Sequence, residues 1–111
     1  MKIALSIQRN DKNSPIDPRF GRCRYFYIAD TSDGTRTIIE NSAGTNALQG
    51  AGLKAVQIIA EFGATILVTG QVGPKAASAL KAAGIRAYAM GSGTAEDALA
   101  KFERNELSPL V

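Results

Sequence analysis

The spacing of apolar residues changes near residue 41, and this change limits the folds open to the chain. Before it, apolar and polar residues alternate, as at Ile3, Leu5 and Ile7, which predicts strands. After it, segments with helical spacing are separated by short apolar runs such as residues 65–69, which are typical of strands buried on both faces. The chain therefore predicts three antiparallel strands followed by strands that alternate with covering helices.

Turn and breaker residues set the expected boundaries of these elements. Ser32-Asp33-Gly34 predicts a hairpin turn, Pro74 a helix start, and Gly63 and Gly84 two helix ends. The expected strands are 2–8, 24–30, 35–40, 65–69 and 86–89, and the expected helices are 50–62, 74–83 and 94–104. The prediction is one α/β domain over residues 1–111, with a mixed five-strand sheet and right-handed crossovers.

Composition excludes several classes of site. One cysteine and no histidine rule out a disulfide framework and the usual zinc arrays, and a lone thiol fits a reducing cytoplasm. No apolar stretch approaches the ~18 residues of a membrane span. The net charge of +3 is modest, and no named nucleic-acid motif occurs. We therefore expect a cytoplasmic protein that binds neither membrane nor nucleic acid, as a monomer or weak homodimer.

The segment 17–26 concentrates positive charge beside the only thiol of the chain. Arg19, Arg22 and Arg24 lie close together around Cys23. Guanidinium groups suit oxyanions, and flanking cations favour the thiolate form of cysteine, a soft metal ligand. The alternatives are arginines that are solvated or paired with Asp17, and a small buried cysteine. We predict that Arg19 and Arg22 bind an anion and that Cys23 is a candidate metal ligand, and leave Arg24 as a solvated charge.

A second candidate site joins a buried strand to the helix that starts at Pro74. The first turn of this helix has unpaired amides and no acid, and Lys75 adds a full charge. Gly70, Gln71 and Gly73 would offer backbone donors there. The spacing is not that of a P-loop, and a tight strand-to-helix turn is the simpler alternative. Ligands of open α/β sheets bind beyond the carboxyl ends of parallel strands, so we expect this turn and the arginine-rich loop to meet.

Catalysis has little support in the sequence. No histidine is present as a base, and no carboxylate pair stands out. The order of elements is similar to that of the ribonuclease H fold. Nucleases with this fold hold metal ions with acidic residues on the central strands. Here the segments 3–7 and 66–69 carry no carboxylate, so we expect no two-metal nuclease chemistry and no enzyme activity.

The chain resembles the dinitrogenase iron-molybdenum cofactor biosynthesis family over nearly its full length. The matching segments are Met1-Lys2-Ile3-Ala4, Asp17-Pro18-Arg19-Phe20-Gly21-Arg22 followed by Tyr25-Phe26, Gly50-Ala51-Gly52, Thr69-Gly70-Gln71-Val72-Gly73-Pro74-Lys75-Ala76, Ala83-Gly84-Ile85, Gly93-Thr94-Ala95-Glu96-Asp97-Ala98 and Asn105-Glu106-Leu107.

The resemblance implies a ribonuclease H-like fold without the nuclease acids, and a non-catalytic protein that binds or carries an iron-sulfur or molybdenum-containing cluster. Arg19, Arg22, Lys75 and free amides would neutralise the cluster, and Cys23 would ligate it. The implied partners are cluster-assembly or acceptor proteins. Two alternatives stay open: a regulatory module for a phosphate-bearing metabolite in the same crevice, and an interaction protein whose loop pairs with an acidic partner.

Overall fold

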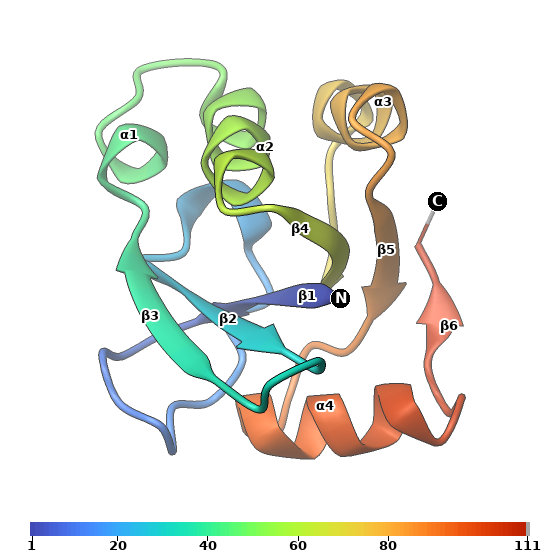
Figure 1. Ribbon diagram of the computed structural model, residues 1–111. Coiled ribbons are helices and arrows are strands. Elements are labelled where there is room, and N and C mark those ends of the chain that lie inside the picture. Colours follow the sequence, from blue (N-terminus) through green and yellow to red (C-terminus); the bar gives the residue numbers. More distant parts are fainter. Residues whose placement is uncertain (111) are drawn as a thin grey trace.

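The computed structural model describes residues 1–110, which form one mixed sheet with helices on both faces (Figure 1). The strand order is β3-β2-β1-β4-β5-β6. The strands are β1 (Lys2–Ile7), β2 (Tyr25–Asp30), β3 (Arg36–Glu40), β4 (Ala64–Thr69), β5 (Arg86–Ala89) and β6 (Ser108–Pro109). The helices are α1 (Ser42–Thr45), α2 (Ala51–Glu61), α3 (Pro74–Ala82) and α4 (Ala95–Glu103), with a 3-10 turn η1 (Phe20–Arg22).

The sheet confirms the expected change from antiparallel to parallel pairing. Ile3 of β1 lies opposite Ala29 of antiparallel β2 and Ile66 of parallel β4. The expected count of five strands is wrong, because β6 pairs antiparallel with β5 and adds a sixth. This strand is only Ser108 and Pro109, and so short a segment has no apolar alternation from which it could be recognised.

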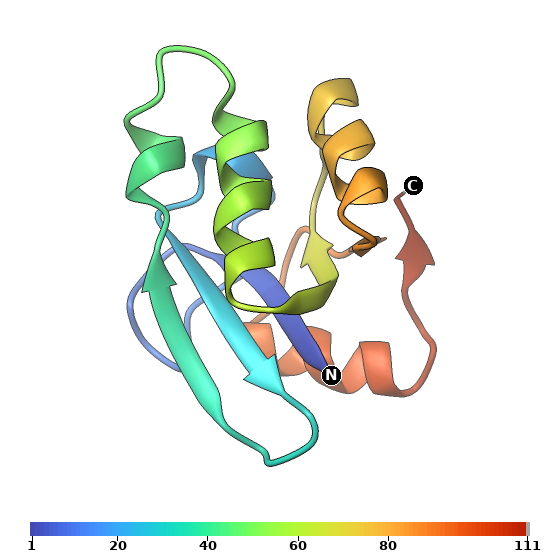
Figure 2. The same ribbon diagram turned by 45° about the horizontal axis from the view of Figure 1, so that its top comes forward.

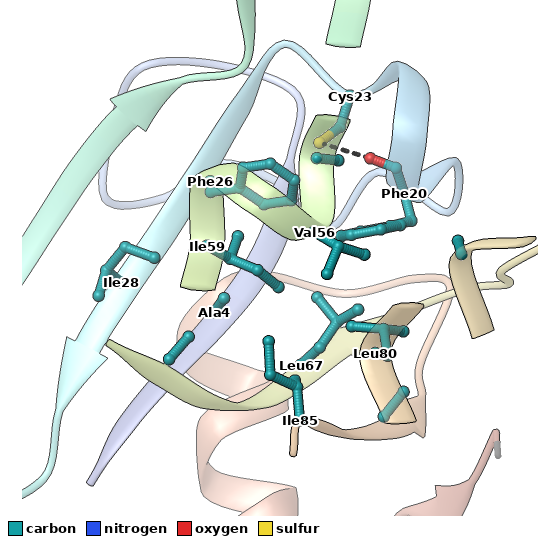
Figure 3. Packing of buried hydrophobic residues seen from close by; sticks show 14 residues of the cluster. Ala4, Phe20, Cys23, Phe26, Ile28, Val56, Ile59, Leu67, Leu80 and Ile85 are labelled. Atoms are coloured by element: carbon teal, nitrogen blue, oxygen red, sulfur yellow. Dashed lines mark hydrogen bonds between the residues drawn. The ribbon is translucent and has the colours of Figure 1, made fainter. Parts of the chain in front are cut away.

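Helices α1, α2 and α3 lie on one face of the sheet, and α4 lies on the other (Figures 1 and 2). The core is divided accordingly. Figure 3 shows the cluster under α2 and α3, where Phe26, Ile59 and Leu67 are fully buried. Tyr27 and Leu99 belong to the second cluster, under α4. The side chains of neighbouring residues in the central strands therefore pack on opposite faces of the sheet.

Local sequence explains how the helices begin. Thr94 accepts a hydrogen bond from the backbone N–H of Asp97, whose carboxylate accepts from the Thr94 N–H, so α4 starts with a capping box. Pro74 is the first residue of α3, as predicted. The short helix α1 falls in a segment expected to be loop, because a single turn offers no apolar spacing. No helix within residues 1–110 has the length and apolar character needed to cross a membrane.

Candidate anion-binding groove

A groove of about 510 Å³ lies where η1 meets the first turns of α2 and α3. Arg22 of η1 and Lys75 of α3 both line it, together with Gln71 and Gly73. The structure thus brings together the two segments that the sequence predicted would meet. None of the lining residues, all within the described chain, carries a carboxylate. The groove therefore presents two cations with no acidic side chain beside them.

Both helices that open onto the groove start without a side-chain cap. Gly50 precedes α2 and Gly73 precedes α3, and neither has a side chain that could accept a hydrogen bond from the first turn. No acid lies in the first turn of either helix. The first N–H groups of an α-helix lack intrahelical partners, and the helix start carries partial positive charge. Two such starts on one groove favour a ligand that is negatively charged and accepts hydrogen bonds.

Glycines allow these elements to approach closely. A Cβ atom on Gly21 would lie 2.8 Å from the backbone nitrogen of Gly52, and a Cβ on Gly52 would lie 2.9 Å from the Cβ of Ala76. Both distances are shorter than an ordinary van der Waals contact. Gly52 therefore allows α2 to pack closely against the neighbouring helix α3. A side chain at either position would push the walls of the groove apart.

The two cationic side chains that line the groove differ in the contacts that they already make within the protein. One guanidinium nitrogen of Arg22, Nη1, donates to the carbonyl oxygen of Ala47 at 2.8 Å and lies 3.5 Å from that of Gly44. Arg22 thereby holds the segment between α1 and α2 against η1. Lys75 takes part in no ion pair within residues 1–110. Its ammonium group is the more available charge for a ligand.

Arg19 and Gly70 do not line the groove. The guanidinium of Arg19 forms a bidentate ion pair with the buried Asp17. Its Nε donates to Asp17 Oδ1 at 3.1 Å, and its Nη2 donates to Oδ2 at 3.0 Å. This pairing raises the pKa of Arg19. A Cβ on Gly70 would lie 2.5 Å from the Cβ of Pro18, and the adjacent Gln71 N–H donates to the Pro18 carbonyl at 3.1 Å. Gly70 therefore positions the two loops against each other.

The thiol of Cys23 faces the core rather than the groove. The residue is fully buried, and its Sγ donates to the carbonyl oxygen of Phe20 at 3.2 Å (Figure 3). Burial raises the pKa of Cys23 to about 12, and the negative charge of Asp17 adds to this effect. The expectation that the flanking Arg22 and Arg24 favour the thiolate is wrong here, because the loss of solvent around the sulfur outweighs the charge of Arg19, which is the arginine that lowers this pKa. The described residues contain no group of three or more His, Cys, Asp and Glu that could hold a metal ion.

Sequence reasoning missed a buried polar cluster that anchors the arginine-rich loop. The hydroxyl of Ser6 hydrogen-bonds the Asp17 carbonyl oxygen at 2.6 Å and the Thr69 hydroxyl at 2.7 Å. All three residues are buried where β1 and β4 end. The hydroxyl residues Ser6 and Thr69 near the ends of two central strands were the available signal, because buried hydroxyls require partners.

A second cavity, of about 500 Å³, lies at the other end of α3, between Ser78, Lys81 and Arg86. It also has basic residues. It adjoins the last turn of α3, where carbonyl groups are unpaired and the helix carries partial negative charge. The groove at the helix starts is the better site for an anion.

Comparison with known proteins places these features in a family. The family model described as dinitrogenase iron-molybdenum cofactor matches residues 1–105. An uncharacterized protein of Methanocaldococcus jannaschii is 34% identical over 110 residues, which cover 96% of this chain and 89% of that protein.

Solved structures are similar over the same length. The apo form of the orange protein from Desulfovibrio gigas has a TM-score of 0.93 at 34% identity, covering 97% of this chain and 91% of that one. A putative NifB protein from Thermotoga, solved by NMR, has a TM-score of 0.86 at 33% identity, covering 98% and 92%. The segments that form the groove therefore all lie inside the region of similarity.

Proposed function

Because the chain belongs to the dinitrogenase iron-molybdenum cofactor family, we propose that it is a non-catalytic carrier or chaperone for an anionic iron-sulfur or molybdenum-containing cluster. The cluster is cargo, and it binds in the groove between η1, α2 and α3. The observation that carries this proposal is the meeting of two uncapped helix starts with Arg22 and Lys75 in a groove lined by no carboxylate.

The donors that line the groove suit hydrogen bonding and charge rather than metal coordination. Its lining residues, all among the described ones, include no thiol, imidazole or carboxylate. An iron or molybdenum ion without its own ligands would find none of these three groups among the described lining residues. We infer that the cargo is a cluster whose metals already carry sulfide ligands. Backbone N–H groups of α2 and α3 would donate to these sulfides, while Arg22 and Lys75 balance the charge.

The same set of residues supports binding over chemistry. A catalytic groove needs a nucleophile or a group that transfers protons, and the lining side chains are mostly small or apolar. Cys23 would act as a ligand only if η1 moved off the core, because its sulfur is enclosed with Phe20 and Phe26.

The test is anaerobic reconstitution with iron, sulfide and molybdate, followed by absorption spectroscopy of the desalted protein. Lys75→Met should lower the amount of bound cluster, and Lys101→Met is the matched control because Lys101 lies on α4, across the sheet. Cys23→Ser should retain uptake. Equal uptake by the wild type and the Lys75→Met variant, at the level of a protein-free blank, would reject the proposal.

A phosphate-bearing metabolite is the second candidate for the same groove. It is favoured by the lack of metal-binding side chains among the described lining residues, because phosphate needs only N–H donors and cations. Calorimetry with a panel of nucleotides separates the two functions. Binding of a nucleotide that survives Cys23→Ser and is lost in Arg22→Ala would favour the metabolite.

We further propose a fold assignment, partners and a cellular location for this protein. The order β3-β2-β1-β4-β5 supports a ribonuclease H-like assignment, with no carboxylate on β1 or β4. Cluster-assembly or acceptor proteins are the proposed partners, because a carrier must receive and deliver its cargo. A single reduced thiol supports a cytoplasmic location.

A further inference from the structure

The two edges of the sheet are protected very differently. At one edge, β6 is only two residues long and contains Pro109, which has no backbone N–H to offer to another chain. At the other edge lies β3, Arg36–Glu40, which is longer and contains no proline. Figures 1 and 2 show β3 as the outermost strand on its side of the sheet.

Hydrogen bonds to β2 show which backbone groups of β3 face outward. Asn41 N–H donates to the Arg24 carbonyl, and Asp30 N–H donates to the Thr35 carbonyl. In an antiparallel ladder such bonded pairs recur at every second residue, so odd-numbered residues of β3 face β2. The N–H and C=O groups of Arg36, Ile38 and Glu40 therefore point away from the sheet.

This edge is complementary to itself. We propose that β3 pairs antiparallel with β3 of a second copy of this chain, centred on Ile38. In this register Ile38 lies opposite Ile38 of the second copy, and Arg36 lies opposite Glu40 of the second copy, twice by symmetry. All three outward-facing residues then form mutually hydrogen-bonded pairs. A two-fold axis at Ile38 makes the contact isologous and closed, so it forms dimers rather than fibres.

The side chains select this register. Arg36, Ile38 and Glu40 share the face of the sheet that packs toward α4, and Ile38 is only partly buried against that core cluster. Glu40 forms no ion pair within residues 1–110, so its carboxylate is available to pair with a cation of the second copy. Arg36 binds Glu96 through Nε at 2.8 Å, which leaves Nη2 for a second carboxylate. Parallel pairing would instead place like charges opposite each other.

The contact is small, because one short strand from each copy supplies it, so the dimer forms only at high protein concentration. Sedimentation up to millimolar concentration should show a monomer-dimer equilibrium. Glu40→Lys should raise the dissociation constant about tenfold, because two attractive pairs become repulsive. Glu103→Lys is the matched control: it makes the same charge change on α4 and should leave the equilibrium unchanged.

Amide resonances locate the contact independently. With rising concentration, the N–H signals of Arg36, Ile38 and Glu40 should shift more than those of Thr37 and Ile39, which face β2. A protein that stays monomeric at millimolar concentration would overturn the proposal. So would a dimer that Glu40→Lys and Glu103→Lys affect equally, because a different surface would then form it.

Discussion

The burial of Cys23 predicts a thiol that is almost unreactive in the folded protein. Its pKa is raised from 9.0 to about 12, because the enclosed sulfur loses the solvent that would stabilise the thiolate. Only the thiolate attacks disulfide reagents or ligates metal, and each pKa unit lowers its fraction tenfold. A difference of about three units lowers the thiolate fraction near neutral pH about 10³-fold.

The assay follows the colour released by an aromatic disulfide reagent, in native buffer and in guanidinium chloride. The native rate should be at least about 10³-fold slower than the denatured rate, with Cys23→Ser as the blank. Native labelling within about tenfold of the denatured rate would refute the reasoning. It would also restore Cys23 as an accessible ligand for a cluster in the groove.

The same raised pKa predicts how stability depends on pH. The folded state holds the Cys23 proton more tightly than the unfolded state, so this contribution to the free energy of unfolding is fully present below the unfolded pKa. It is lost as pH rises from 9.0 toward about 12. Denaturant midpoints should fall over that range, and less steeply in Cys23→Ser. An equal slope in both proteins would contradict the assignment.

Three further predictions concern the fold. Gly52→Ala should lower the unfolding free energy by about 1 kcal/mol, because overpacking against Ala76 outweighs the better helix propensity. Adding Ala76→Gly to the same chain should restore the thermal midpoint. If the effects of the two substitutions simply add, the clash between residues 52 and 76 is not the cause. Thr94→Ala should cost about 1 kcal/mol in thermal melts through loss of the α4 cap. Spectrophotometric titration should find Tyr27 ionising near pH 12, because burial and its hydrogen bond to Glu96 raise the pKa; Glu96→Gln should lower that value.

The candidate groove shows how far the sequence could go. Sequence alone indicated that Arg22 and Lys75 would meet, because both loops follow strands whose ends lie on one side of the sheet. It placed Arg19 in the same site, yet the ion pair with Asp17 turns that side chain to another role. The sequence left Asp17 open as a partner of all three arginines, and only the folded loop decides which of them comes within reach of its carboxylate.

Properties that depend on near neighbours in the chain could be read from the sequence. These are the order of β1 to β5 with α2, α3 and α4, the start of α3 at Pro74 and the lack of an acid in its first turn. They rest on hydrogen bonds within one turn and on side-chain spacing, both of which a short segment specifies by itself.

Tertiary structure decided the properties that arise between distant segments. It buried Cys23 under η1, set Gly52 against Ala76, added β6 beside β5 and left β3 open at the edge. Solvent exposure, ion pairing and pKa are set by the atoms surrounding a group, and here those atoms come from elements far apart in the chain. The sequence therefore suggests electropositive surroundings for a cysteine between two arginines, whereas the folded protein places that cysteine in an apolar core.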